Sequence, residues 1–431
     1  MAHTASTPIR ESTPLTADII GGLTTFVTMA YIVIVNPAIL ASPGTGMPFS
    51  GVLTATVLIA CSMTLLMGLY ARLPFAVAPG MGINAFVAFS VIQGQQVPWP
   101  TALGMVFWAG VLFLAVSATP LREQIAAAIP NNLRVAAAAG IGLLLTFIGL
   151  RSAGLVEGDP VTIVRLGHLD ARAALMVGGL LVAVMLSRRR HPLAYLAAIG
   201  TVTAGAWGLG LAQPPASLFS PPDFTSVFLK LDVVGALKLA LLPATVSILF
   251  TDLFDSLSTF IGVATASGLT EPDGQPLRLR RGLIVDAVAT FAAGLAGTSS
   301  GTAFVESIAG IRMGGRTGRS AVVTALCFVP CFFIGPLAAG IPAYATAPVL
   351  LLVGVAMFQT IAGLDFTTLE DALPAFLTLV LIPLTFSITQ GILWGFILHV
   401  ALYAVTGRWR ELPVVMWGLA ATAVALLVIE A

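Results

Sequence analysis

Apolar residues fill long stretches of this chain, from about Ile19 to Val405, with short polar turns between them. A helix that crosses the hydrocarbon core of a bilayer needs roughly 20 apolar residues. The apolar runs and their Gly, Pro and charged punctuation predict fourteen such spans, at residues 18–41, 50–70, 75–92, 100–119, 133–151, 171–187, 191–211, 236–266, 281–297, 300–312, 317–338, 345–362, 373–388 and 389–406. A further apolar stretch, Leu412 to Ile429, fits either an additional span or an interfacial helix.

Two of these spans are too short and too rich in glycine to be plain helices: VAPGMGINAFVAFSVI, from Val77, and LAGTSSGTAFVESIAGI, from Leu295. Both contain Ala-Phe-Val, beginning at Ala85 and at Ala303, 218 residues later (303 minus 85). They are the third and tenth spans, and a shift of seven spans reverses the direction across the membrane. The pattern therefore predicts two inverted repeats, with chance identity of a tripeptide as the alternative.

The glycines also predict that both spans are broken. Glycine lets the chain run extended before a half-helix, which leaves backbone N–H groups that are tolerable only beside a polar cavity. The start of each half-helix then offers a partial positive charge to a polar solute. Pro79 and the run Thr298-Ser299-Ser300 favour such a break. Close packing of helices on small residues is the alternative.

Composition places the chain in a lipid bilayer. Of its 431 residues, 58% are hydrophobic and 9% are charged, too few polar groups to cover a soluble domain. The loops leave no room for a soluble enzyme domain, and no Walker-type loop or zincin motif is present. Three cysteines in apolar runs indicate neither a zinc site nor a disulfide framework. No cofactor, metal or nucleic acid partner is expected.

The basic residues predict the orientation. Five of the twenty Lys and Arg residues fall on one side of the predicted membrane, and the other fifteen fall on the side of the N-terminus. The five are Arg151, Arg165, Arg172, Lys230 and Lys238. The positive-inside rule then places the N-terminus in the cytoplasm, with residues 1–16 as a short tail. We expect an integral protein of a bacterial-type inner (plasma) membrane.

Four acids lie deep in apolar sequence: Asp252, Asp255, Asp286 and Glu306. Each costs about 2.5 to 3.5 kcal/mol at a helix centre, so each needs a partner, a proton or a water-filled cavity. Asp252 and Asp255 are three residues apart and share one helical face. Two carboxylates there disfavour double ionisation, so the pair is a candidate for proton coupling. Either acid could instead cap a broken helix, and Asp286 is expected to bond a neighbouring helix.

Glu306 follows Phe304 by two residues, about one turn into the second half-helix. A carboxylate accepts hydrogen bonds in pairs, and an aromatic ring offers a stacking face. Together they suit a flat heterocycle with N–H groups on its edge. Asn84 holds the corresponding place in the first half-helix and can donate and accept. The alternatives are that Glu306 caps its own helix and that Asn84 makes a structural hydrogen bond.

Several segments are long enough to be specific, and they resemble the purine permeases of the azaguanine-resistance type, a branch of the nucleobase:cation symporter-2 family. The resemblance runs in order from about residue 15 to 406 and rests on TTFVTMAYIVIVNPAIL (24–40), APGMGINAF (78–86), FTDLFDSLSTFIGVA (250–264), GTSSGTAFVES (297–307), GGRTGRSAVV (314–323), PAYATAPVLLLVGV (342–355) and LPAFLTLVLIPLTFSITQGI (373–392).

The resemblance implies an all-α polytopic fold of seven plus seven spans in inverted repeat. Spans 1–4 and 8–11 form a core domain, residues 17–120 and 213–340. Spans 5–7 and 12–14 form a gate domain, residues 121–212 and 341–407. Residues 408–431 remain as a C-terminal hydrophobic segment. The substrate then binds at Glu306, Asp252, Phe304 and Asn84, while Asp255 and Asp252 serve proton coupling.

Two departures bear on the substrate. Ser307 follows Glu306 where the ascorbate and xanthine branch has Asn, and Ser256 stands where uracil permeases have histidine. Both favour adenine, guanine or hypoxanthine, imported with protons by alternating access. An anion permease of the sulfate type is the alternative, but it would need a cationic or neutral site. An integral-membrane enzyme would need a nucleophile and base, which these segments lack. A homodimer is compatible with this reading.

Overall fold

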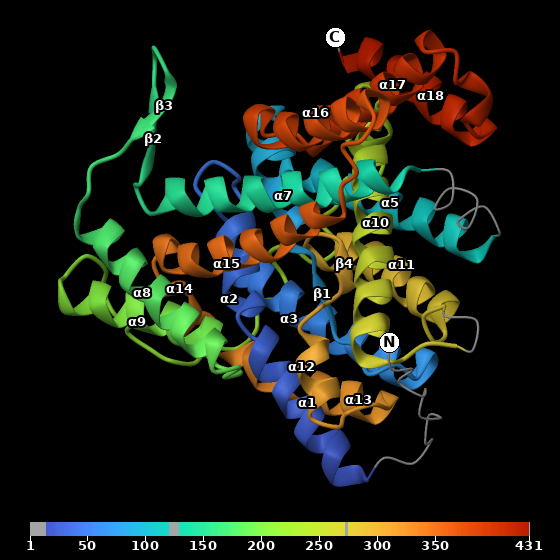
Figure 1. Ribbon diagram of the computed structural model, residues 1–431. Coiled ribbons are helices and arrows are strands. Elements are labelled where there is room, and N and C mark those ends of the chain that lie inside the picture. Colours follow the sequence, from blue (N-terminus) through green and yellow to red (C-terminus); the bar gives the residue numbers. More distant parts are fainter. Residues whose placement is uncertain (1–13, 120–128, 272–274, 431) are drawn as a thin grey trace.

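The computed structural model describes residues 14–119, 129–271 and 275–430, which are mostly helical (Figure 1). The predicted N-terminal tail lies mainly outside the described residues, as does the predicted core–gate boundary at residues 120 and 121. Eight helices in the described part are long and apolar enough to cross a membrane, which confirms an integral membrane protein.

The first half of the chain begins with two helices that continue each other and ends at α9. Its elements are α1 (Leu15–Met29), α2 (Ile32–Leu40), α3 (Phe49–Leu66), η1 (Met67–Ala71), β1 (Val77–Pro79), α4 (Met81–Ala85), η2 (Phe86–Gly94), α5 (Trp99–Ala118), α7 (Asn131–Ser152), β2 (Val156–Asp159), β3 (Ile163–Leu166), α8 (Ala171–Arg188) and α9 (Ala194–Gly208).

The second half repeats the order of a helix pair, a short strand and a short helix. Its elements are η3 (Gly235–Leu237), η4 (Leu239–Leu241), α10 (Leu242–Ser267), α11 (Leu279–Ala296), β4 (Gly301–Ala303), α12 (Ser307–Arg312), α13 (Gly318–Phe328), η5 (Val329–Phe333), α14 (Gly335–Ala339), η6 (Ala343–Thr346), α15 (Ala347–Phe358), η7 (Gln359–Gly363), α16 (Leu369–Thr385), α17 (Ile388–Val405), η8 (Trp409–Glu411) and α18 (Val414–Glu430).

The expectation of an all-α chain is wrong for four short strands. β1 pairs with β4 inside the body, and β2 and β3 form a hairpin that projects away from the helices (Figure 1). Pro79 has no backbone N–H, and glycines flank both inner strands, so neither segment holds a continuous helix. The stretch from Leu412 to Ile429 forms the single helix α18.

The helices sort into two packed sets. The first helix group contains α1, α2, α3, α5 and α10 to α13, which pack mainly on one another. The second helix group contains α7, α8, α9 and α15 to α17. The groups meet where α10 contacts α7 and α17, where α4 contacts α7, and where α2 contacts η6.

Large apolar side chains cover much of the outer surface. Leu181 on α8 is 65% exposed, Val355 on α15 is 52% exposed, and Val424 on α18 is 48% exposed. Lipid tails solvate such a surface as well as a protein core does. Inside the first helix group, Gly21 of α1 lies so close to Gly315 that an added Cβ would be 2.5 Å from the Gly315 Cα. Small residues thus allow close helix contact there.

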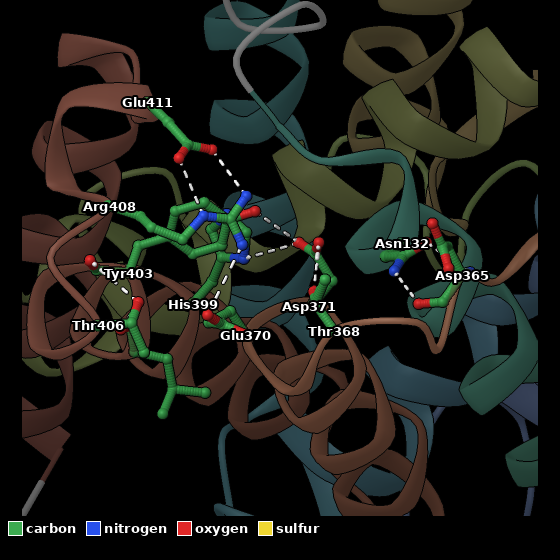
Figure 2. Close-up of polar contacts among 11 residues, drawn as sticks. Asn132, Asp365, Thr368, Glu370, Asp371, His399, Tyr403, Thr406, Arg408 and Glu411 are labelled. Atoms are coloured by element: carbon green, nitrogen blue, oxygen red, sulfur yellow. Dashed lines mark hydrogen bonds and ion pairs between the residues drawn. The ribbon is translucent and has the colours of Figure 1, made fainter.

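A polar cluster ties together the ends of α16 and α17 (Figure 2). Asp371 accepts hydrogen bonds from Tyr403 (3.0 Å) and Thr368 (2.9 Å). Arg408 forms a bidentate pair with Glu411 at 2.9 and 2.7 Å. Nearby, Asn132 of α7 exchanges two hydrogen bonds with the backbone of Asp365. These contacts fix one end of the second helix group.

Asp223 fastens the long segment between α9 and α10 onto α3. Its carboxylate accepts hydrogen bonds from Ser50 (2.8 Å) and Ser226 (2.6 Å), and Thr54 accepts its backbone N–H (3.0 Å). Burial acts to raise the pKa of Asp223. The hydrogen bonds from Ser226, Ser50 and the Thr225 N–H outweigh it and hold the pKa well below its usual range. The ionised form is therefore the one that joins the segment to α3.

Asp223→Asn should lower the stability of the purified protein at neutral pH by about 1 kcal/mol, since one charge-assisted set of hydrogen bonds is weakened at a partly exposed site. A depressed pKa in the folded state stabilises above the unfolded pKa, and that stabilisation is lost as pH falls. The difference between wild type and variant should therefore shrink in acid. Thermal unfolding from pH 7 down to about pH 2, below the unfolded pKa of an aspartate, measures it.

Asp159→Asn is the matched control, because Asp159 accepts the N–H groups of Val161 and Thr162, whose bonds lie within its own exposed turn. Equal stability of wild type and Asp223→Asn at neutral pH would contradict the role given to Asp223.

Candidate functional site

A two-stranded antiparallel ribbon, β1 with β4, lies in the middle of the molecule (Figure 1). Val77 is opposite Ala303, and Pro79 is opposite Gly301. Backbone bonds extend the pairing at both ends, from the Gly80 N–H to the Ser300 carbonyl (2.8 Å) and from the Phe304 N–H to the Ala76 carbonyl (2.9 Å). The two segments that resemble each other in sequence therefore meet in space.

Side chains complete the hydrogen bonds of the ribbon's outer edges. The Thr64 hydroxyl bonds both the N–H and the carbonyl of Val77, each at 2.9 Å. The Ser307 hydroxyl accepts the Ala76 N–H at 3.0 Å, and the Asp286 carboxylate accepts the Ala303 N–H at 3.1 Å. Since buried backbone groups need partners, these side chains make an extended segment tolerable between apolar helices.

Asp286 on α11 holds strand β4 through the Ala303 N–H. It also interacts with Ser256 of α10, in line with the expected bond to a neighbouring helix. It is fully buried, and its other oxygen, Oδ1, has no partner among the described residues. The bond to the strand could not be predicted from the sequence, because Ala303 is 17 residues away from Asp286 in the chain.

Asp252 on α10 is fully buried at the same ribbon. One of its oxygens accepts the hydroxyl of Thr290 on α11, and Thr290 is also 2.9 Å from the Ser300 hydroxyl. The other oxygen, Oδ1, lacks a partner in the described part of the chain. A buried acceptor without a partner costs free energy, so Asp252 is equipped to accept a hydrogen bond from a solute.

Asp255 is one turn further along α10 and is only partly buried. Its Oδ2 would lie 3.9 Å from a Cβ added at Gly80, which places it beside the point where β1 gives way to α4. It is also close enough to Glu306 to interact with it electrostatically. The two aspartates of the predicted pair thus have different neighbours, Thr290 for Asp252 and Glu306 for Asp255.

Glu306 immediately precedes α12, so its predicted place one turn inside a half-helix is wrong. The extended segment runs to Ala303 and the helix begins only at Ser307, which leaves Glu306 at the helix start without a side-chain capping bond. Its Oε1 accepts the Tyr31 hydroxyl at 2.6 Å. Phe304, between strand and helix, is 6% exposed.

Asn84 on α4 is fully buried and bonds Asn36 of α2, donating from Nδ2 to the Asn36 Oδ1 at 2.9 Å. Asn36 in turn donates to Thr56 (2.7 Å) and Thr298 (2.8 Å). The structural hydrogen bond weighed for Asn84 is therefore present. Its carbonyl oxygen has no partner among the described residues, so it remains able to accept one.

Tyr31, Asn36, Thr64 and Thr290 complete this region, and sequence reasoning did not identify them. Of these four residues, Asn36 could have been singled out from the sequence, because it is an amide within an apolar run. Tyr31 and the threonines are indistinguishable by pattern from ordinary members of a helix core. In the described residues, no cluster of three His, Cys, Asp or Glu could hold a metal ion.

The arrangement has a distinct chemical character. Its charged groups are carboxylates, its neutral groups are hydroxyls and amides, and acceptor oxygens of Asn84, Asp252 and Asp286 have no partner among the described residues. Such a site favours a solute that brings N–H groups. Apolar membrane helices that enclose a polar site around two interrupted segments define a secondary membrane transporter.

Comparison with known proteins identifies the family. The chain belongs to the Permease family, whose family model matches residues 16–394. It is 39% identical to an adenine permease of Escherichia coli, AdeP, over 94% of this chain and 91% of that one. It is also 39% identical to a guanine/hypoxanthine permease of Bacillus subtilis, PbuO, over 93% of this chain and 94% of that one. The resemblance to purine permeases is thereby confirmed.

Solved structures share the fold. The transmembrane domain of a cyanobacterial bicarbonate transporter, BicA, matches with a TM-score of 0.66 at 19% identity, over 88% of this chain and 97% of that one. The anion transporter SLC26A9 matches with a TM-score of 0.66 at 10% identity, over 91% of this chain and 65% of that one. The inverted-repeat fold of these membrane domains is therefore the fold of this chain.

Replacing Asp286 should separate its support of the ribbon from its charge. Asp286→Asn keeps an oxygen for the Ala303 N–H, whereas Asp286→Ala leaves that N–H buried and unpaired, at a cost of about 1 to 3 kcal/mol. Thermal unfolding of purified variants in detergent should rank wild type and Asp286→Asn together and Asp286→Ala clearly lower. Equal stability of the two variants would show that Asp286 does not support β4.

Proposed function

We propose that this chain is a secondary active transporter that imports purine nucleobases (adenine, guanine and hypoxanthine) with protons by alternating access. The observation that carries the proposal is the end-to-end similarity to relatives named as adenine and guanine/hypoxanthine permeases. The polar character of the site supports it, because purines are flat heterocycles with N–H groups on their edges.

In this proposal the nucleobase binds beside the ribbon of β1 and β4. Glu306 accepts a ring or exocyclic N–H, and Phe304 offers a face for stacking. Asp252 contributes its unpartnered oxygen, and Asn84 contributes its carbonyl oxygen. These four residues come from α10, α4 and the segment around β4, so one solute would join both halves of the repeat.

Proton coupling is assigned to Asp255, with Asp252 as the second candidate. Asp255 is partly exposed and next to Glu306, so a proton can reach it while the nucleobase site is open. Charge on several carboxylates in one low-dielectric site is unfavourable, which links protonation to substrate binding. The nucleobase and the proton are then released into the cytoplasm when the site closes to the outside and opens to the inside.

The moving parts in this proposal are the two helix groups. The first corresponds to the core domain, spans 1–4 and 8–11, and carries the site; the second corresponds to the gate domain. Fourteen spans follow when the interrupted segments around β1 and β4 each count as one crossing. The basic residues support a cytoplasmic N-terminus in a bacterial-type inner membrane.

An anion transporter is the second candidate, because BicA and SLC26A9 share the fold. At identities of 19% and 10%, the similarity shows a shared fold and does not indicate a shared substrate. An anion would meet Asp252, Asp255, Asp286 and Glu306, with no arginine, lysine or histidine among their described hydrogen-bond partners. The charge of the site therefore favours the nucleobase.

Uptake of radiolabelled purines tests the proposal directly. The chain is expressed in cells that lack their own purine permeases, and uptake of adenine, guanine, hypoxanthine and bicarbonate is measured against an empty vector. Saturable uptake of at least one purine, reduced by a protonophore, is expected. Saturable bicarbonate uptake without purine uptake would transfer the assignment to anions.

Glu306→Gln should reduce purine uptake at least roughly tenfold, because a neutral amide replaces a charge-assisted acceptor and each 1.4 kcal/mol corresponds to a factor of ten. Initial rates normalised to protein in the membrane measure the loss. Glu157→Gln is the matched control, since Glu157 lies in the β2–β3 hairpin and pairs with Arg165 at 3.5 Å. Full activity in Glu306→Gln would remove Glu306 from the site.

Asp255→Asn should flatten the dependence of uptake on external pH while leaving measurable purine binding, because the asparagine cannot take up a proton. Initial rates from pH 5.5 to pH 8 compare it with wild type, and Asp223→Asn serves as the control acid outside the site. An unchanged pH profile in Asp255→Asn would assign coupling elsewhere, with Asp252→Asn as the next variant to measure.

A further inference from the structure

Tyr31 bonds the acid proposed as the main substrate contact. It lies between α1 and α2, and its hydroxyl donates to the Glu306 Oε1 at 2.6 Å. That distance is typical of a hydroxyl bonded to a carboxylate, the stronger class of hydrogen bond. The side chain is 1% exposed, so water offers no alternative partner for the hydroxyl. Glu306 thus has an internal donor at one of the two oxygens that a nucleobase could use.

The backbone around Tyr31 holds the phenol in place. Its carbonyl accepts the N–H groups of Ile34 (3.0 Å) and Val35 (2.9 Å), which start α2. The hydroxyl therefore reaches Glu306 from a fixed helix junction, 275 residues away in the chain. A carboxylate oxygen has two acceptor sites, so a ligand N–H can either share Glu306 with this fixed donor or displace it.

Tyr31 also touches the second helix group. Its ring meets the ring of Tyr195 edge to face, with centroids 4.9 Å apart and planes at 77°. Tyr195 lies in the first turn of α9, which packs on α8 and α15. One side chain of the first helix group thus contacts both the site acid and the opposing group.

We propose that the Tyr31 hydroxyl occupies Glu306 in place of the nucleobase N–H, and that its displacement by substrate loosens the contact between Tyr31 and Tyr195. Binding at Glu306 would then weaken the contact with α9, so the two helix groups would separate there more readily when the site is loaded. Tyr31 is in this sense a positioning and coupling residue. The inference rests on the proposed function, since it needs a substrate that donates to Glu306.

Tyr31→Phe separates competition from simple support of Glu306. Phenylalanine keeps the ring against Tyr195 and removes only the donor. If the hydroxyl competes with substrate, equilibrium binding of the radiolabelled purine to purified protein should tighten, with Kd falling roughly five- to tenfold. If the hydroxyl merely supports Glu306, Kd should rise. Tyr70→Phe is the control, because Tyr70 lies in η1 and is 45% exposed, and its Kd should stay within about twofold of wild type.

The outcomes distinguish the two proposals. Absence of saturable purine binding by wild type would overturn the proposed function and the role of Tyr31 with it. Wild-type binding combined with an unchanged or higher Kd in Tyr31→Phe would overturn only the role of Tyr31.

Infrared difference spectra give a second readout, which is independent of affinity. The chain has only five tyrosines, so a shift of a tyrosine C–O band on purine addition can be assigned by substitution. The proposal expects such a shift, lost in Tyr31→Phe. An unperturbed set of tyrosine bands at saturating purine would contradict it.

Discussion

Every backbone N–H and carbonyl inside an apolar body must find a partner within the protein, and this constraint shapes the centre of the molecule. Helices satisfy it alone, but the chain leaves helical structure at Val77–Pro79 and again at Gly301–Ala303. The two extended segments meet the requirement by pairing with each other. Their outer edges then depend on the side chains of Thr64, Ser307 and Asp286.

The site follows from this solution. Extended backbone brings hydroxyls and carboxylates to the middle of the membrane body, and some of their atoms are left without a partner in the described residues. Asp252 and Asn84 each keep an open acceptor, while Glu306 is bonded by Tyr31. The groups that make the ribbon tolerable and the groups proposed to bind the solute thus occupy the same small volume. Their closeness gives the proposed coupling between the halves a physical basis.

Much of this architecture could be predicted from the sequence, and the limits have physical causes. The membrane spans, the two interrupted segments and the buried acids all depend on local composition, so they are visible in the chain itself. The pairing of Val77 with Ala303 is a contact between distant segments. The repeated Ala-Phe-Val indicated that the two segments correspond, but it did not predict that they pair or in which register. For the same reason the bond from Asp286 to Ala303 could not be predicted from the sequence.

Helix boundaries at the site were less predictable than helix positions. Glu306 was placed inside a helix because the apolar pattern cannot show that α12 begins only at Ser307. Tyr31 and Thr290 were missed because a tyrosine or threonine within an apolar run is compatible with an ordinary core. Their roles depend on partners 275 and 38 residues away.

The most direct test of the account is a cryo-electron microscopy structure of the chain with its best-bound purine. The account predicts ring density beside the paired segments Val77–Pro79 and Gly301–Ala303, with a purine nitrogen within hydrogen-bond distance of Glu306. Density for the purine among the helices of the second group, away from both paired segments, would contradict it.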